Sequence, residues 1–233
     1  MKVVTVIVTY KTKKSLLSQA VSTLKKLGSG KIIIIDNTKH NRGFAKAVNL
    51  GFKRVVLKNF DLLCVANPDI MVYKGSKTDL SHAMHYFDIF GGIMKQDGKN
   101  YLGGYIDKNN LAAGLKEGVL KKDFFSVDFV SGSLMFIKPE VYLSLGGFDE
   151  RFFMYYEDVD FCYRAIKNSF KVGVTKAIVY KHFETSKNLK NKKSLLLESW
   201  LKFVLKNGNL KQKIRALSKI IPQKVLNKLW KLV

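Results

Sequence analysis

The chain has 233 residues, of which 47% are apolar and 25% are charged, which is typical of a globular protein with one sizeable core. No apolar run reaches the roughly 18 residues that a membrane-spanning helix needs, and the two cysteines, Cys64 and Cys162, exclude a disulfide framework and a zinc site. The formal net charge is +23, and its excess lies mainly in residues 185–233, where thirteen Lys and Arg accompany the single acid Glu198.

The first seventy residues alternate between β-branched apolar runs and amphipathic stretches. The predicted buried strands are residues 2–9, 31–36 and 61–70, and the predicted helices are residues 15–27 and 44–58. We interpret the first run as a strand and not a signal peptide, because no small-residue cleavage site follows it. Ser15 should cap the first helix and Gly28 should end it. This alternation implies a parallel sheet with helices on both faces.

Polar residues follow each of these three strands. They are Thr9-Tyr10, Asp36-Asn37 and Asn67-Pro68-Asp69. Because ligands bind beyond the carboxyl ends of parallel strands, we expect one shared site along this edge of the sheet.

The second half of the chain has a looser pattern. The predicted elements are a helix over residues 78–87, short strands and turns over 89–107, strands within 125–139 interrupted at 131–133, and a strand that ends at His182. We therefore expect a mixed second half packed on the parallel first half within one domain.

Residues 146–165, GGFDERFFMYYEDVDFCYRA, concentrate acids in a chain that is otherwise poor in them. Asp149, Glu157, Asp158 and Asp160 lie among seven aromatic residues. The apolar spacing predicts a helix from about residue 156, whose dipole would favour acids in its first turn. Alternatively, a carboxylate held beside aromatic rings in a partly dry cleft can act as a general base, and we favour this interpretation.

Residues 194–233 predict two or three amphipathic helices, with Pro222 at the start of one. The apolar stripe consists of Ile214, Leu217, Ile221, Val225, Leu229 and Trp230. This tail either packs on the body of the protein or lies in the plane of an anionic membrane surface, because lysines cover its polar face. Basic tracts also bind nucleic acids, but no signature of a nucleic-acid-binding fold is present, so we expect no specific nucleic-acid partner.

Six stretches of the sequence form a familiar series. In chain order they are IVTYK, IIIIDN, NRGFAKAVNLG, ANPDI, VSGSLMFIKPEV and GGFDERFFMYYEDVDFCYRA. Together they resemble the inverting family 2 glycosyltransferases of the GT-A fold, and most of all the rhamnosyltransferase-like branch. The resemblance covers about residues 2–185. It implies a three-layer α/β/α fold with a mostly parallel central sheet, a mixed second half and C-terminal amphipathic helices, divided into a glycosyltransferase domain (1–185) and a basic helical tail (186–233).

The resemblance also implies an activity. A sugar such as rhamnose would move, with inversion, from a nucleoside-diphosphate sugar to a hydroxyl of a glycan or polyprenyl-diphosphate-linked acceptor, in the synthesis of a cell-surface polysaccharide. Mg²⁺ or Mn²⁺ would stabilise the charge that develops on the leaving diphosphate. We expect such an enzyme in the cytoplasm, peripheral on the inner face of the cell membrane.

The matching motifs assign roles to residues. The implied nucleotide-sugar-binding residues are Thr9, Tyr10, Asp36, Asn41, Arg42, Gly43, Lys46, Asn67, Gly132 and Ser133. The implied metal ligands are Asp69 and His182, and the implied base is Asp158, with Glu157 as its substitute. Two departures stand out: Asn67 replaces the first acid of the family's Asp-X-Asp motif, and only residues 38–40 separate the Asp-Asn from the Asn-X-Gly-Phe motif, where relatives carry a longer insert.

Two other functions remain open from the residues alone. A nucleotidyltransferase acting on sugar phosphates would share a similar nucleotide-binding half, but VIVTYKTKKS lacks the glycines that such enzymes carry after their first strand. A non-catalytic protein that binds nucleotide-sugars or nucleic acids is the second alternative.

Overall fold

The structure, a computed structural model, describes residues 1–119, 121–184 and 191–220. Its strands are β1 (Val3–Thr9), β2 (Ser29–Asp36), β3 (Leu62–Ala66), β4 (Ile70–Lys74), β5 (Ile89–Gln96), β6 (Lys99–Ile106), β7 (Ala113–Glu117), β8 (Phe124–Ser126), β9 (Leu134–Ile137) and β10 (Val172–His182). Its helices are α1 (Lys14–Leu27), α2 (Phe44–Phe52), α3 (Lys77–Tyr86), α4 (Pro139–Ser144), α5 (Glu157–Lys167), α6 (Lys192–Asn207) and α7 (Leu210–Ile220), with a 3₁₀ turn η1 (Leu57–Asn59).

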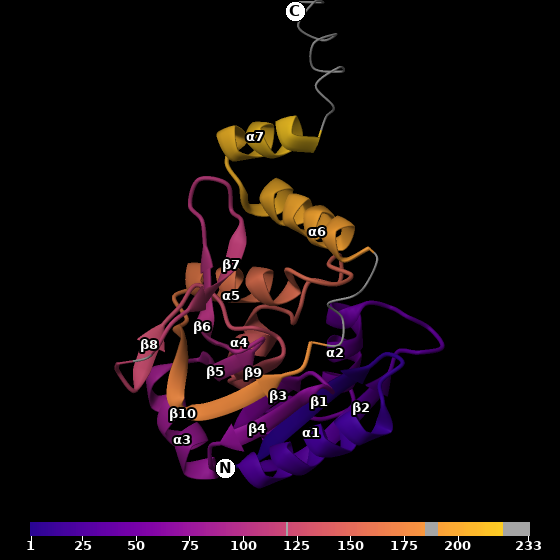
Figure 1. Ribbon diagram of the computed structural model, residues 1–233, viewed down its shortest axis with the longest axis vertical. Coiled ribbons are helices and arrows are strands. Elements are labelled where there is room, and N and C mark those ends of the chain that lie inside the picture. The colour runs from indigo at the N-terminus through magenta and orange to yellow at the C-terminus, as the bar shows by residue number, and fades with distance from the viewer. Residues whose placement is uncertain (120, 185–190, 221–233) are drawn as a thin grey trace, which may run out of the picture.

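One sheet runs through the molecule in the order β2-β1-β3-β9-β5-β10-β4 (Figure 1). β1 pairs in parallel with β2 and β3, as the alternating first half predicts. Beyond β3 the sheet is mixed, because β9 and β4 run antiparallel to their neighbours while β5 and β10 pair in parallel. The expected α/β architecture, a parallel first half followed by a mixed second half, is therefore confirmed.

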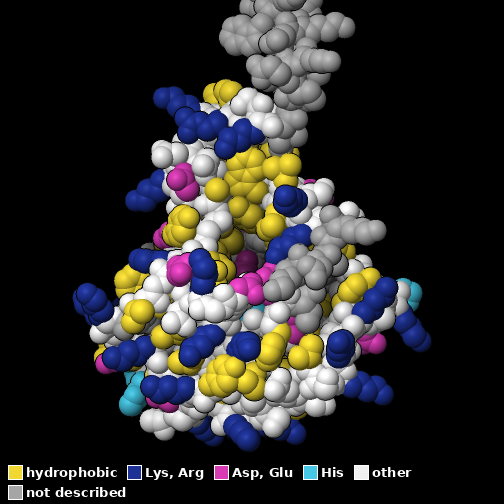
Figure 2. Space-filling view, in the orientation of Figure 1, with side chains coloured by type: hydrophobic (Ala, Val, Ile, Leu, Met, Phe, Trp, Pro, Cys, Tyr) yellow, Lys and Arg dark blue, Asp and Glu magenta, His cyan; other side chains and the backbone are white. Residues whose placement is uncertain are grey.

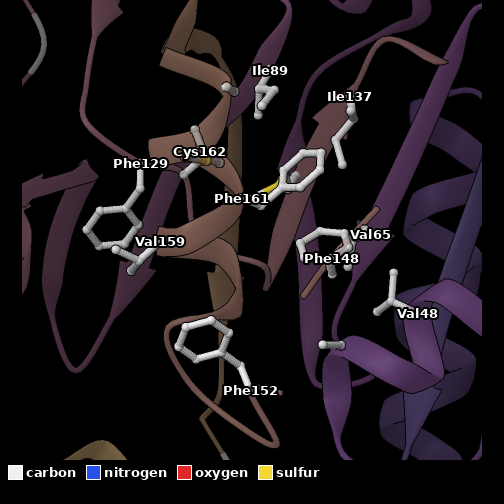
Figure 3. Packing of buried hydrophobic residues seen from close by; sticks show 14 of the residues in the cluster. Val48, Val65, Ile89, Phe129, Ile137, Phe148, Phe152, Val159, Phe161 and Cys162 are labelled. Atoms are coloured by element: carbon white, nitrogen blue, oxygen red, sulfur yellow. The ribbon is translucent and has the colours of Figure 1, made fainter. Parts of the chain in front are cut away.

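Helices cover both faces of this sheet and make the three layers. On one face, buried residues of α1 and α3 pack with strand residues such as Ile7 and Phe90. On the other face, a larger cluster joins α2, α4 and α5 to the sheet, and it also includes residues of α6 and α7. Figure 3 shows Phe161 of α5 pointing toward Phe148 and Ile137. The rings of Phe161 and Phe148 stack with their centroids 4.6 Å apart, which anchors α5 beneath the edge that carries the polar residues.

Local details differ from the sequence expectations in three places. Lys13, not Ser15, is the N-cap of α1, and no side chain caps this helix. The helix expected over residues 44–58 ends at Phe52, because the chain turns there into η1 before β3 begins. β2 is an edge strand that pairs only with β1 among the described strands, so Ile34 is 43% exposed where we expected a fully buried strand.

Two of the expected tail helices, α6 and α7, are present. Residues 221–233, which include Ile221, Pro222, Val225, Leu229 and Trp230 of the predicted stripe, lie outside the described residues. Among the helices that the structure describes, none is long and apolar enough to cross a membrane.

Candidate active site

The carboxyl ends of β1, β2 and β3 meet at one edge of the sheet. Thr9 lies opposite Asp36 in the register of β1 and β2, and Ile7 lies opposite Ala66, the last residue of β3. Thr9 is buried, whereas Tyr10 beyond it is 43% exposed. The parallel topology thus brings the first predicted nucleotide-binding residues together.

A buried asparagine closes the short loop that follows β2. The side-chain N–H of Asn37 donates to Asn41 Oδ1 at 3.1 Å and to the Gly43 carbonyl at 3.2 Å, while its Oδ1 accepts from the Arg42 backbone N–H at 3.2 Å. Sequence reasoning noted Asn37 only as a strand end, although an asparagine that ends a strand before a tight turn is a usable signal. The loop is compact because the Asn37 side chain bonds both a backbone carbonyl and a backbone N–H within it.

Asp36 faces solvent at the start of this loop. The Thr38 side chain and its backbone N–H, which donates to Asp36 Oδ1 at 2.9 Å, hold the pKa of Asp36 below its usual value. Asp36 is therefore an exposed carboxylate. Arg42, later in the loop, is half-buried, and Lys46 is exposed on the first turn of α2.

Gly43 makes a close approach to the loop that precedes α5. Its φ of 84° suits glycine, and a Cβ there would lie 2.6 Å from the carbonyl oxygen of Phe153. The next backbone N–H, that of Phe44, donates to the same carbonyl at 2.7 Å. The start of α2 is thereby fixed to the segment that carries Glu157 and Asp158.

Two aromatic residues in a left-handed conformation lead into α5. Tyr155 and Tyr156 have φ values of 68° and 65°, a conformation that costs non-glycine residues of the order of 1 kcal/mol or more each. Tyr156 is held on two sides, because its hydroxyl accepts from the Ala113 N–H at 3.0 Å and its ring lies 5.6 Å from that of Phe203. This strained turn fixes the position at which α5 begins, and with it the positions of Glu157 and Asp158.

Asp158 reaches across to the loop between β8 and β9. Its Oδ2 accepts from the Gly132 N–H at 2.8 Å, and its Oδ1 accepts from the Val159 N–H at 2.8 Å. Ser133 beside it is buried, and its hydroxyl lies 2.8 Å from that of Tyr180 and 2.9 Å from that of Ser131. Gly132 thus contributes its backbone to the site, whereas the Ser133 side chain bonds within the protein.

Glu157 and Asp158 differ in their surroundings. Burial, and then the neighbouring charge of Asp158, raise the pKa of Glu157 well above its usual value. Burial also raises the pKa of Asp158, but backbone N–H groups, first that of Gly132, oppose that rise. Within the described residues, Glu157 Oε2 has no hydrogen-bond partner. The proton therefore belongs on Glu157 and the negative charge on Asp158.

The predicted metal ligands lie together at the next strand ends. His182 Nε2 is 3.4 Å from Asp69 Oδ1 and 3.2 Å from the side-chain nitrogen of Asn67. In the part of the chain that the structure describes, no three His, Cys, Asp or Glu side chains form a cluster that could hold a metal ion. One carboxylate and one imidazole nevertheless fit an ion whose other ligands are substrate phosphates and water, as is common for Mg²⁺.

The base and metal sides of the site are joined by direct contacts. The Asn67 N–H donates to the Ser133 carbonyl at 2.9 Å, and the N–H of the preceding residue, Gly132, donates to Asp158. A series of contacts therefore leads from Asp158 through Gly132 and Ser133 to Asn67. From Asn67 it continues through His182 to Asp69. Figure 2 shows acidic side chains gathered in a hollow near the middle of this face, below the hydrophobic side chains of the α6 and α7 region.

Asp149 and Asp160, two other acids of the 146–165 stretch, form ion pairs inside the protein. Asp160 is fully buried between Arg164 at 2.8 Å and Lys206 at 2.7 Å, and Lys206 also pairs with Asp149 at 2.7 Å. Arg164 also donates to the carbonyls of Leu145 and Gly147. Sequence reasoning missed Lys206, because a basic tail gives no sign of which lysine is buried.

Two curated glycosyltransferases are similar in sequence to this chain. The low-salt glycan biosynthesis hexosyltransferase Agl10 of Haloferax volcanii is 28% identical over 141 residues, which cover 57% of this chain and 46% of the relative. The N-acetylglucosaminyl-diphospho-decaprenol L-rhamnosyltransferase of Mycobacterium tuberculosis is 30% identical over 121 residues, 43% of this chain and 39% of the relative. Each match therefore spans less than half of the relative's length. No family model matches the chain.

Solved structures show the same fold at low sequence identity. GalNAc-T7 with UDP, GalNAc and Mn²⁺ gives a TM-score of 0.70 at 14% identity, covering 88% of this chain and 47% of that one. The mannosyltransferase PcManGT of Pyrobaculum calidifontis, in complex with GDP-Man and Mn²⁺, gives 0.58 at 10% identity, covering 92% and 68%. The chain has the GT-A fold, and the resemblance to GT-A glycosyltransferases that its motifs indicate is confirmed.

Proposed function

We propose that this chain is a metal-dependent, inverting glycosyltransferase. It transfers a hexosyl group, rhamnose for example, from a nucleoside-diphosphate sugar to a hydroxyl of a glycan or lipid-linked acceptor in cell-surface polysaccharide synthesis. The relatives' names support glycosyl transfer, and one of them names a diphospho-decaprenol-linked acceptor.

One observation carries this proposal: the contacts that join Asp158 to Asp69 across the edge of the sheet. A base must lie close to the position where the leaving diphosphate is held, because the acceptor attacks the carbon that bears it. The path runs by hydrogen bonds from Asp158 to Gly132, from the adjoining Ser133 to Asn67 and from Asn67 to His182, which lies 3.4 Å from Asp69; this supports a single site that contains both carboxylates.

Asp158 acts as the general base. It takes the proton of the acceptor hydroxyl while that oxygen attacks the anomeric carbon from the face opposite the diphosphate. Its raised pKa makes it a stronger base than an exposed aspartate, and the Gly132 and Val159 N–H groups keep its carboxylate oriented. Glu157, neutral beside it, leaves the negative charge on Asp158.

The donor side uses the first three strand ends. Thr9, Tyr10 and Asp36 flank the nucleoside, while Arg42 and Lys46 bring positive charge toward the diphosphate. Asp69 and His182 would hold Mg²⁺ or Mn²⁺, which when bound neutralises charge on the leaving diphosphate. Both solved neighbours described above contain Mn²⁺ and a nucleotide or nucleotide-sugar.

The enzyme works in the cytoplasm, peripheral on the inner face of the membrane. The outer surface of α7 supports this placement, because its apolar residues Leu210, Ile214 and Leu217 are 73%, 59% and 41% exposed. Lys and Arg surround them: Lys211, Lys213, Arg215 and Lys219. An exposed apolar stripe bordered by cations fits an anionic lipid surface.

A donor screen tests the proposed activity. The melting temperature of the full chain is measured with UDP-, GDP- and dTDP-sugars, each with and without Mn²⁺. One nucleotide class should raise it in a Mn²⁺-dependent manner, because a ligand that binds only the folded state stabilises it. That donor should then be hydrolysed slowly, and a transferred sugar should have inverted anomeric configuration by NMR. A chain that binds none of these donors and hydrolyses none of them is not this enzyme.

A further inference from the structure

A polar network reaches His182 from the side opposite Asp69. The side-chain oxygen of Gln96, the last residue of β5, lies 2.9 Å from His182 Nδ1. Gln96 Nε2 donates to Glu184 Oε2 at 2.7 Å, and Lys192, the first residue of α6, pairs with Glu184 Oε1. The side chains of His182 and Glu184 are only 12% and 14% exposed, so these contacts are largely shielded from water.

The network fixes which way the Gln96 amide points. Glu184 Oε2 lies 2.7 Å from Gln96 Nε2 and its other oxygen pairs with Lys192, so the amide N–H₂ of Gln96 faces an acceptor. The amide oxygen then faces His182 Nδ1. An oxygen acceptor at 2.9 Å requires a proton on Nδ1.

The Asn67 amide, which lies nearer the opposite ring nitrogen than the Asp69 carboxylate at 3.4 Å does, agrees with this. The side-chain N–H₂ of Asn67 lies 3.2 Å from Nε2 and can donate to its lone pair. The neutral imidazole therefore carries its proton on Nδ1 and presents an unprotonated Nε2 on the side of Asp69. An unprotonated ring nitrogen is the form of histidine that binds a metal ion.

We propose that Gln96 is a positioning residue which, supported by Glu184 and Lys192, holds the His182 proton on Nδ1 and so prepares Nε2 as a ligand beside Asp69. This inference rests on the proposed function for the identity of the ion. It also makes the start of α6 part of the support of the site. Glu184 adopts a left-handed φ of 42°, and its contacts to Gln96 and Lys192 hold it in that conformation.

The test compares Gln96→Met with the unaltered chain. Methionine has nearly the same shape as glutamine but cannot accept strongly from Nδ1–H. The His182 tautomer is read from ¹⁵N–¹H NMR of the metal-free full chain at about pH 8, where an ordinary imidazole is neutral. The unaltered protein should show the Nδ1–H form, and Gln96→Met should shift toward Nε2–H. The dissociation constant for Mn²⁺ alone, measured by electron paramagnetic resonance, should rise about 10- to 100-fold.

Gln212→Met is the matched control. Gln212 of α7 is also half-buried, and its side chain also donates and accepts, to the Lys108 carbonyl and from the Asn209 N–H, so the same chemical change should leave the tautomer and Mn²⁺ affinity unaltered. If Gln96→Met does not fold, Lys192→Met, which loosens Glu184, should shift both readouts in the same direction by a smaller amount.

The outcomes separate this inference from the proposed function. An Nε2–H tautomer in the unaltered chain, or no change of tautomer in a folded Gln96→Met, overturns the role of Gln96. Failure of the unaltered chain to bind Mn²⁺, together with the Nδ1–H tautomer and its loss in Gln96→Met, supports the positioning role and contradicts metal dependence.

Discussion

At the residue scale, the surroundings of Glu157 and Asp158 distinguish which of the two carboxylates we propose as the general base. The two side chains are adjacent in the chain, yet Asp158 accepts two backbone hydrogen bonds while one oxygen of Glu157 accepts none from the described residues. Because hydrogen bonds to a carboxylate favour its charged form, this environment supports Asp158, of the two, as the proposed base.

Asp158→Asn should therefore abolish most turnover without weakening donor binding. The amide keeps the size of the side chain but cannot take a proton, so kcat should fall about 10²- to 10⁴-fold. Donor affinity, measured by thermal shift with the nucleotide-sugar identified in the screen, should change little. An equal loss of donor affinity would show that Asp158 binds substrate and does not act as the base.

The raised pKa of Glu157 predicts that the contribution of this residue to stability falls as the pH rises. Its folded-state pKa is raised, so between its usual value of 4.5 and the raised value the folded chain holds a proton that the unfolded chain has released. Its contribution is fully present below 4.5 and is lost as pH rises through the raised pKa. The melting temperature of Glu157→Gln, relative to the unaltered chain, should thus increase from about pH 5 to about pH 8.

Glu140→Gln, an exposed substitution at the start of α4, is the control and should leave the pH profile of stability unchanged. A pH-independent difference for Glu157→Gln would mean that Glu157 is ionised in the folded state.

At the scale of elements, α6 braces the segment that carries the base. Ser199 donates to the Met154 carbonyl at 2.8 Å, and Phe203 packs on Tyr156 and Tyr163. Lys206 reaches Asp160 in the interior. Helix α6 thus contacts the strained turn before Glu157 and the buried Asp160 after Asp158. Through Lys192 it also pairs with Glu184, close to the proposed metal ligand His182.

Lys206→Met should destabilise the protein by about 1.5–3 kcal/mol, the range for hydrogen bonds to charged groups, because it leaves buried Asp160 with the Arg164 ion pair and a longer hydrogen bond from Asn207 at 3.4 Å. Lys202→Met, one turn earlier on α6, removes an exposed pair with Glu198 and should cost less than about 1 kcal/mol. Urea unfolding of the two variants measures the difference. Equal free energies of unfolding would show that α6 does not hold the acids in place.

At the scale of the whole molecule, α6 and α7 lie together at the top of the view in Figure 1, and α7 carries the exposed apolar residues Leu210, Ile214 and Leu217. Trp200, Phe203 and Val204 of α6 and Ala216 of α7 are buried in the same cluster as α5. Removal of the tail after about residue 195 would therefore expose part of the core, and it is an unsuitable test of membrane binding.

Substitution confined to α7 is the better test. Changing Leu210, Ile214 and Leu217 to Gln should release the protein from anionic liposomes in a sedimentation assay while the melting temperature changes little, because these side chains are exposed. Val56→Gln with Leu143→Gln alters apolar side chains that are 65% and 47% exposed beside α2 and α4, and this control should still sediment. Unchanged sedimentation of the α7 variant would contradict a lipid-binding role for this helix.

The sequence by itself determined the alternation of strands and helices, the edge where the polar residues meet and the resemblance to GT-A glycosyltransferases. These features follow from local periodicity, because the spacing of apolar residues along the chain indicates which face of a strand or helix is buried. The ends of α1 and α2 differed, because caps and turns depend on single contacts that periodicity does not encode.

Only the tertiary structure separated the acids that are paired inside the protein from those at the candidate site. Asp149 and Asp160 are paired by Lys206 from a helix 46 or more residues away, and His182 is oriented by Gln96 across 86 residues. The composition of the tail indicates a solvated or lipid-facing face but does not distinguish the buried lysine from the exposed ones. A lysine that packing removes from water needs an acidic partner, and the fold determines which acid lies within its reach.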